Sequence, residues 1–326
     1  MPASAERSDT PIGTEEKATE KKVLLASPRG WCAGVERAVE IVERSLARYG
    51  PPVYVRKQIV HNLHVVRGLE AKGAIFVESE DDVPEGSICV LSAHGVSPAV
   101  RENAARRGLS VVDATCPLVA KVHVEARRFA AGGKTIFLIG HANHEEIEGT
   151  SGEAPTQTIV IERPEDIDAA RAVDPAAVAY LTQTTLAVDD TAEVVEALRT
   201  RFPGLAGPRL DDICYASQNR QLAVKALAAR SDIVLIVGSG NSSNANRLVE
   251  VAHEAGAPAW LVEDVRSIEV PWLEGTTVVG VSSGASTPDV LVEQVVSWLR
   301  DCGYALVEEL PVATEDVHFP LPAGLD

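Results

Sequence analysis

One pattern, a strand that ends at a cysteine and is followed by a helix, occurs three times in this sequence at intervals of about 90 residues. The runs KVLLASPRGWC, LSVVDATC and RLDDIC are typical of strands, and they end at Cys32, Cys116 and Cys214. In the stretches that follow, apolar residues recur with the spacing of an amphipathic helix. This repetition predicts an α/β fold of three similar parallel-sheet units, arranged as a pseudo-threefold trefoil around a central cavity.

Two further strand-to-helix junctions in each unit carry polar residues. The first junction, at His61, His144 and Ser242, follows its cysteine by 29, 28 and 28 residues. The polar residues of both sets of junctions are His61, His94, His144, Glu146, Thr184, Ser242, Asn244 and Ser286. Because ligands of open parallel sheets lie outside the carboxyl ends of the strands, we expect these side chains and the three cysteines to converge on one cavity.

The repeats predict the organisation of the chain. A leader spans residues 1–21, three α/β units span 22–115, 116–213 and 214–302, and a tail spans 303–326. The strand before Cys32 has no earlier unit to join, so we expect it to pair with the third unit and close the ring. The leader is polar and without apolar periodicity, which predicts disorder. For the tail we expect disorder rather than a flap over the cavity.

Charge and hydropathy exclude several classes of protein. A net charge of −17 argues against nucleic acid as the main partner, because phosphate binding needs a basic surface. No apolar run reaches the roughly 18 residues that a membrane helix needs. The leader has no hydrophobic segment of a secretory signal, and its acidic residues do not fit a transit peptide. The sequence therefore predicts a cytoplasmic protein with no membrane partner.

The cysteines indicate a metal centre. Their odd number of five, their wide spacing and the absence of a CxxC pair argue against disulfides and against a zinc ribbon. Three thiolates from separate units suit a 4Fe–4S cluster, which would leave one iron open to a ligand. Zinc held by three cysteines with an open position is the alternative. Cys89 and Cys302 lie outside the repeated pattern, and we expect them in the core and at a helix end.

The ring of polar residues indicates an anion site. The segments GSGNSSN and SSGAS are small and rich in hydroxyls, and helix N-termini favour phosphate through their free N–H groups and dipole. No Walker lysine follows them, so they do not form a nucleotide P-loop. Simple helix capping is the alternative role of each Ser, Thr and Asn. Protonated His61, His94 and His144 would bind a diphosphate by charge-assisted hydrogen bonds.

Glu146 is the one acid expected in the ring. A carboxylate beside an anion is repelled, so its presence indicates proton transfer rather than binding. We expect its neighbours Glu145 and Glu148 on the solvated face of the same helix. The remaining histidines fall outside the junctions and are expected to be structural: His64, His123, His141, His253 and His318.

Nine segments between residues 22 and 302 carry a resemblance to a known family. They are GWCAGVERAV, VHNLHVV, SAHGVSP, DATCPLV, GHANHEEIEGT, TQTTLAVDDT, DDICYASQNRQ, VGSGNSSNANRL and GASTPD. In these segments the sequence resembles the 4-hydroxy-3-methylbut-2-enyl diphosphate reductases of the non-mevalonate isoprenoid route. Trp31 is a departure, because Phe is more usual there.

The resemblance implies a site and a reaction. It implies a 4Fe–4S cluster on Cys32, Cys116 and Cys214, proton delivery by Glu146, and Thr184 beside the substrate hydroxyl. It also implies a diphosphate pocket formed by His61, His94, His144, Ser242, Ser243, Asn244 and Ser286. The implied reaction adds two electrons and two protons to a small allylic diphosphate and expels its hydroxyl as water. The products would be isopentenyl and dimethylallyl diphosphates, and the electrons would come from a ferredoxin- or flavodoxin-like donor.

Two other functions use the same residues. A zinc-dependent hydrolase or lyase acting on a small phosphate ester would use the three cysteines for zinc. An iron–sulfur sensor would use them without catalysis, although the acidic charge and the lack of a nucleic-acid-binding motif disfavour a DNA-binding sensor.

Overall fold

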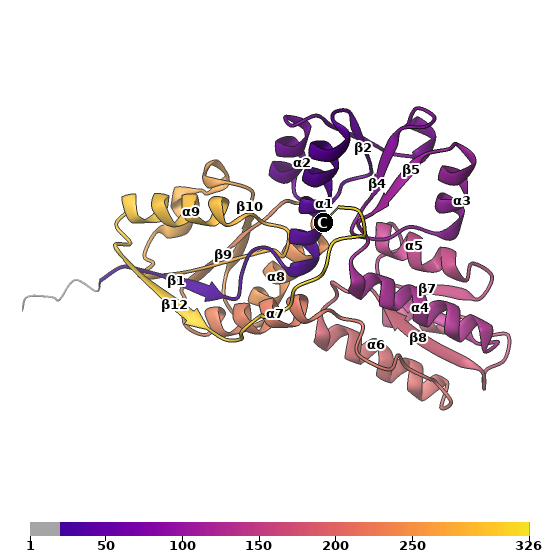
Figure 1. The fold of residues 1–326 in the computed structure, drawn as a ribbon. Coiled ribbons are helices and arrows are strands. Elements are labelled where there is room, and N and C mark those ends of the chain that lie inside the picture. The colour runs from indigo at the N-terminus through magenta and orange to yellow at the C-terminus, as the bar shows by residue number, and fades with distance from the viewer. Residues whose placement is uncertain (1–19, 326) are drawn as a thin grey trace, which may run out of the picture.

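A computed structural model describes residues 20–325, so the predicted leader lies almost wholly outside the described residues. Its strands form three separate parallel sheets, of five, four and three strands. Figure 1 shows the three sheets with their helices as three lobes that meet at the centre of the molecule. The predicted α/β class with three parallel-sheet units is therefore confirmed.

The first lobe contains a four-stranded sheet in the order β3-β2-β4-β5. Its elements are α1 (Ala33–Tyr49), β2 (Val53–Arg56), α2 (Leu63–Glu70), β3 (Ala74–Val77), β4 (Ile88–Leu91), α3 (Pro98–Arg106) and β5 (Ser110–Asp113). One face of α1 is buried against this sheet, where Val39 and Val42 pack with Val53 and Val55. The central strands β2 and β4 are mostly buried, as expected for a parallel sheet that is covered by helices.

The second lobe contains a three-stranded sheet in the order β7-β6-β8. Its elements are α4 (Pro117–Ala131), β6 (Thr135–Ile139), α5 (Glu145–Glu153), β7 (Thr158–Ile161), β8 (Val178–Thr182) and α6 (Val188–Arg201). The strand predicted before Cys214 is wrong, since only Ala206 forms a bridge to Ala179 and residues 207–213 are irregular. Within the predicted run, Asp211 and Asp212 are poor strand residues. Pro208, just before it, cannot donate a ladder hydrogen bond.

The third lobe contains the five-stranded sheet, in the order β10-β9-β11-β1-β12. Its elements are β1 (Lys22–Ser27), α7 (Tyr215–Ala228), β9 (Ile233–Val237), α8 (Ser243–Glu254), β10 (Ala259–Val262), β11 (Val278–Ser283), α9 (Asp289–Asp301) and β12 (Leu306–Pro311). The first strand β1 pairs in parallel with β11, with Lys22 opposite Val278, and also with β12. The first strand of the chain therefore lies in the sheet of the third unit.

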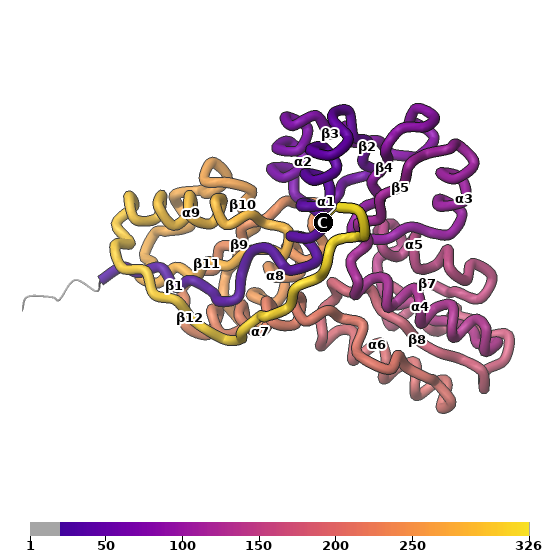
Figure 2. Tube along the Cα trace, in the orientation of Figure 1, coloured from indigo at the N-terminus to yellow at the C-terminus, as the bar shows by residue number. Residues whose placement is uncertain are grey.

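The tail is ordered, so the expectation of a disordered tail was wrong for residues 303–325. After β12 the chain leaves the third lobe and crosses to the first lobe, as the yellow end of the tube shows (Figure 2). There Leu325 is buried in the core beneath α1, and Leu321 packs against the same core. The guanidinium of Arg44 donates a hydrogen bond to the Leu325 carbonyl at 3.2 Å. These apolar and polar contacts fasten the tail in a way that composition alone does not reveal.

Among the helices in the described part of the chain, none is both long enough and apolar enough to cross a membrane.

A candidate active site where the three units meet

A single cavity lies at the junction of the three lobes. It is lined by all twelve residues proposed from the sequence: Cys32, His61, His94, Cys116, His144, Glu146, Thr184, Cys214, Ser242, Ser243, Asn244 and Ser286. Each of these residues lies in a loop between a strand and a helix or at the start of a helix. The carboxyl ends of three parallel sheets point towards one place, which explains why residues so far apart in sequence meet there.

The three cysteines of the cavity occupy equivalent positions. Cys32, Cys116 and Cys214 are the N-cap residues of α1, α4 and α7. Gly34 separates two of the sulfurs, since a Cβ at that residue would lie 2.7 Å from Cys116 Sγ and 3.8 Å from Cys32 Sγ. A side chain at residue 34 would therefore occupy the space between the thiols.

The chemistry of these thiols suits a cation. Burial raises the pKa of Cys116 to about 12, with the neighbouring Cys32 as the next cause. Burial likewise raises the pKa of Cys214 to about 11 and outweighs the hydrogen bonds from Ser217. Without a metal the thiols of Cys116 and Cys214 stay protonated, whereas a bound cation would stabilise thiolates at all three cysteines together. The donor set of three sulfurs on partly buried cysteines fits an iron–sulfur cluster or zinc.

Cys89 and Cys302 lie away from this cavity. The side chain of Cys89 is fully buried in β4, and burial raises its pKa to about 11. Cys302 is exposed at the C-terminal end of α9. Both residues lie where the sequence predicted them.

Three imidazoles cluster on another wall of the cavity. The rings of His61 and His94 stack with centroids 4.1 Å apart, and His144 lies edge-on to both. Burial, followed by the charge of His94, lowers the pKa of His61 to about 2 and that of His144 to about 3. These two imidazoles are therefore neutral near neutral pH in the ligand-free protein, and their protonation beside a diphosphate stays a prediction. An anion in the cavity would favour their charged forms and raise both pKa values.

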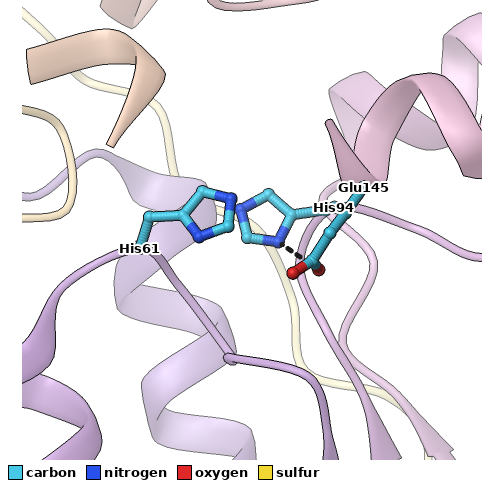
Figure 3. A group of neighbouring side chains, drawn as sticks. All are labelled: His61, His94 and Glu145. Carbon is cyan, nitrogen blue, oxygen red and sulfur yellow. Dashed lines mark ion pairs between the residues drawn. The ribbon is translucent and has the colours of Figure 1, made fainter. Parts of the chain in front are cut away.

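The carboxylate of Glu145 pairs with the imidazole ring of His94. A carboxylate oxygen of Glu145 lies 3.2 Å from His94 Nδ1, as Figure 3 shows. The side chain of Glu145 is only 16% exposed, so its prediction as a solvated residue was wrong. Together, single donor atoms of His61, His94 and Glu145 lie within 4.8 Å of one another and form a second group that could hold a metal ion.

Glu148 lies one turn further along α5. Its side chain is 52% exposed, as expected, but it also pairs with Lys57 at 2.7 Å. This pair joins the first and second lobes beside the cavity.

Glu146 and Thr184 form a buried hydrogen-bonded pair. The backbone N–H of Thr184 donates to one carboxylate oxygen of Glu146 at 2.7 Å, and its hydroxyl donates to the other at 2.9 Å. Burial raises the pKa of Glu146 to about 7, although the hydrogen bonds from Thr184 act in the opposite direction. Near neutral pH this carboxyl can therefore both hold and release a proton, which is the property of a general acid.

The third lobe contributes the N-terminus of α8. Ser242 caps this helix, and its hydroxyl accepts from the Ala245 N–H at 3.3 Å. Asn244 accepts from the Ala285 N–H at 2.9 Å, which ties the loop after β11 to the helix. The hydroxyl of Ser286 donates to the His61 carbonyl at 2.9 Å and links the third lobe to the first. A helix N-terminus surrounded by hydroxyl and amide groups suits a phosphate.

Comparison with known proteins assigns the family. The sequence model of the family described as LytB protein matches residues 23–300. The chain belongs to the LytB family. This membership confirms the resemblance carried by the nine sequence segments.

Named relatives of this LytB-family chain share most of its length. It is 60% identical to a protein of Acidothermus cellulolyticus over 94% of this chain and 90% of the relative. It is 56% identical to a protein of Streptomyces coelicolor over 94% of this chain and 90% of the relative. Both relatives are named 4-hydroxy-3-methylbut-2-enyl diphosphate reductase.

A solved structure shares the fold. It is described as the E-1-hydroxy-2-methyl-but-2-enyl-4-diphosphate reductase from Plasmodium falciparum. The TM-score is 0.91 at 39% sequence identity, and the match covers 94% of the LytB-family chain and 97% of the solved one.

Several residues of the LytB-family cavity escaped the sequence analysis. The hydroxyl of Ser217 lies 3.3 Å from Cys214 Sγ, and the hydroxyl of Thr185 lies 3.2 Å from that of Ser243. The phenol oxygen of Tyr215 accepts from the Ala33 N–H at 3.3 Å and thereby connects two of the cysteine helices. The sequence held a usable signal, because each of these residues lies within three positions of a proposed site residue.

Proposed function

We propose that this chain is a 4-hydroxy-3-methylbut-2-enyl diphosphate reductase. It removes the hydroxyl group of the allylic diphosphate by reduction and yields isopentenyl and dimethylallyl diphosphates, the last step of the non-mevalonate supply of isoprenoid precursors. The observation that carries the proposal is the meeting of three thiols, three imidazoles and a protonatable carboxyl in one cavity. The names of the relatives support the same reaction.

We propose that Cys32, Cys116 and Cys214 hold a 4Fe–4S cluster. When bound, such a cluster supplies electrons and an open iron that can act as a Lewis acid on the hydroxyl oxygen. Gly34 leaves the space that the cluster needs between the sulfurs. The three cysteines are partly buried, and the charge of a bound cluster would compensate for the mutual repulsion of their thiolates.

The diphosphate binds on the opposite wall in this proposal. The N-terminus of α8 with Ser242, Ser243 and Asn244 offers N–H, hydroxyl and amide donors to its oxygens. Ser286 completes this wall from the third lobe. The imidazoles of His61, His94 and His144 approach from the first and second lobes. Because the diphosphate favours the charged forms of His61 and His144, its binding is coupled to proton uptake by these two imidazoles.

Glu146 and Thr184 then supply the proton. Hydroxide is a poor leaving group, so a proton must reach the substrate oxygen as the carbon–oxygen bond breaks. The Thr184 hydroxyl lies against the carboxyl of Glu146, and we propose that it relays the proton from that carboxyl to the substrate hydroxyl. The raised pKa of Glu146, about 7, supports this role.

Electrons come from a ferredoxin- or flavodoxin-like donor in this proposal, and the reaction takes place in the cytoplasm. All five cysteines are free, which suits a compartment that keeps thiols reduced.

The proposal is tested by metal and turnover measurements on protein purified without oxygen. Iron and sulfide are measured first, and turnover of the diphosphate with a chemical reductant follows. Changing Cys32, Cys116 or Cys214 to Ser is expected to abolish iron binding, whereas Cys89→Ser and Cys302→Ser retain it as matched controls. Thermal unfolding of each variant excludes misfolding. Equal iron in all five variants would refute the ligand assignment, and zinc without iron would favour the hydrolase or lyase alternative.

A further inference from the structure

One cation follows each of the three cysteines at nearly the same distance. Arg37 and Lys121 are the fifth residues after Cys32 and Cys116, and Arg220 is the sixth residue after Cys214. All three lie in the second turn of a helix that a cysteine caps. The three cations share not only this position but also the kind of contact they make, since each binds backbone carbonyls of a loop that leads to a cysteine.

Arg37, on α1, binds the loop that leads to Cys116. Its guanidinium donates to the carbonyls of Ala114 and Thr115 at 3.3 and 3.1 Å, and these two residues directly precede the cysteine. The same guanidinium donates to the Pro320 carbonyl of the tail at 2.7 Å.

Lys121, on α4, binds the loop that leads to Cys214. Its ammonium group donates to the carbonyls of Leu210 and Asp211 at 2.7 and 2.6 Å. It also pairs with the carboxylate of Asp212 at 3.2 Å. This loop is the one that forms no strand, so contacts with side chains contribute more to its position than they do in the other two loops.

Arg220, on α7, binds the loop that leads to Cys32. Its guanidinium donates to the Gly30 carbonyl at 2.6 and 3.1 Å and to the Trp31 carbonyl at 3.3 Å. The side chain of Arg220 is fully buried, and its charge is paired with Glu315 of the tail at 2.9 Å.

The three contacts close into a cycle. The cation of each cysteine helix binds the carbonyls that precede the next cysteine, and the last cation binds the loop of the first cysteine. We propose that Arg37, Lys121 and Arg220 are positioning residues that hold the three thiols at the mutual distance required to bind one metal centre. This inference rests on the proposed cluster at these cysteines. Hydrogen bonds from charged donors are stronger than neutral ones, so each cation restrains its loop more firmly than a backbone contact would.

The test uses Lys121, because its side chain is 26% exposed, whereas that of Arg220 is fully buried. We expect Lys121→Met to release iron to a chelator about tenfold faster than the wild type under anaerobic conditions, the effect of losing one charged hydrogen-bond donor. Lys121→Arg restores the cation and is expected to release iron at the wild-type rate. Lys225→Met, on α7, is the matched control, since Lys225 pairs only with Asp189 at the surface.

The measurements are the iron and sulfide content after anaerobic reconstitution, the rate of iron release, and the melting temperature of the cluster-free protein. Arg37→Met is measured in the same way, so that the inference does not depend on the folding of one variant. Faster release with an unchanged melting temperature supports a positioning role. Wild-type release rates in both folded Met variants would overturn it. Wild-type protein that takes up no iron would refute the proposed function itself, and the inference would fall with it.

Discussion

Replacement of Glu146 by Gln separates the catalytic use of this carboxyl from its effect on stability. Gln keeps the shape of the side chain and can still accept the hydrogen bond from the Thr184 N–H. It cannot donate a proton as an acid does. A positioned general acid contributes roughly 10²–10⁴-fold to rate, so we expect turnover to fall by that factor. Iron content and diphosphate binding are expected to persist.

The same substitution changes the pH dependence of stability in a known direction. Burial raises the pKa of Glu146 from 4.5 to about 7, so the folded state binds this proton more tightly than the unfolded state does. Its contribution to stability is therefore fully present below pH 4.5 and is lost as the pH rises through 7. At 1.36 kcal/mol per unit, the loss between pH 5 and pH 8 is on the order of 2–3 kcal/mol. The Gln side chain does not titrate. The free energy of unfolding of Glu146→Gln, measured relative to that of the wild type, should therefore rise by about that amount between pH 5 and pH 8.

The assay combines two experiments. Chemical unfolding of the cluster-free protein at pH 5 and pH 8 gives the stability difference, and turnover of the cluster-loaded protein between pH 6 and pH 9 gives the rate. Wild-type turnover should fall above pH 7, as Glu146 loses its proton. Glu148→Gln is the control, because this exposed residue lies on the same helix and surface ion pairs contribute about 0–1 kcal/mol. Near-normal turnover in Glu146→Gln would mean that another group delivers the proton, and an unchanged pH dependence of stability would refute the raised pKa.

The remaining predictions concern the two walls of the cavity. Ser286→Ala and Asn244→Ala each remove a polar group proposed to face the diphosphate, so the affinity of the protein for the diphosphate should fall about ten- to a hundredfold while iron content stays unchanged. Calorimetric titration with the diphosphate measures this affinity. Unchanged affinity in both variants would place the phosphate site elsewhere. Gly34→Ala places a Cβ 2.7 Å from Cys116 Sγ and should reduce iron uptake in a protein that still folds. Gly68→Ala is the control, because a Cβ at this residue of α2 meets open space and, unlike Gly50, Gly68 has no positive φ. Full iron loading in Gly34→Ala would show that the sulfurs do not need this space.

Much of the fold could be predicted because its signals are local. A continuous apolar run such as that of β1 predicts a strand buried on both faces, and the spacing of apolar residues in α1 predicts a helix with one buried face. The repeat of these signals predicts three units. The residues that line the cavity could be selected for a similar reason, since a parallel strand ends where its helix begins, and Cys32 and Cys116 lie at such points. Cys214 lies at the start of α7, after a loop without a strand.

Other features depended on contacts between distant segments. The loop before Cys214 has apolar residues but no strand, because its carbonyls bind Lys121 and the carboxylate of Asp212 accepts from the Thr182 N–H. Glu145 reads as a surface residue of α5, yet it pairs with His94 of another lobe. Glu315 of the tail pairs with buried Arg220, and Leu325 packs in the core under α1. The composition of the tail does not predict either contact.

The sequence alone indicated the three-unit plan and eleven of the residues that line the cavity, because periodicity and strand-to-helix junctions are properties of neighbouring residues; the family resemblance added Ser243. Only the tertiary structure determined the pKa shifts of the buried side chains in the cavity. It also determined which cysteine loop each of the cations Arg37, Lys121 and Arg220 binds. Burial sets the pKa values of His61 and Glu146, and burial depends on what the other lobes place around them. The cycle of cations likewise needs three helices at fixed mutual distances, and those distances exist only after the lobes have packed.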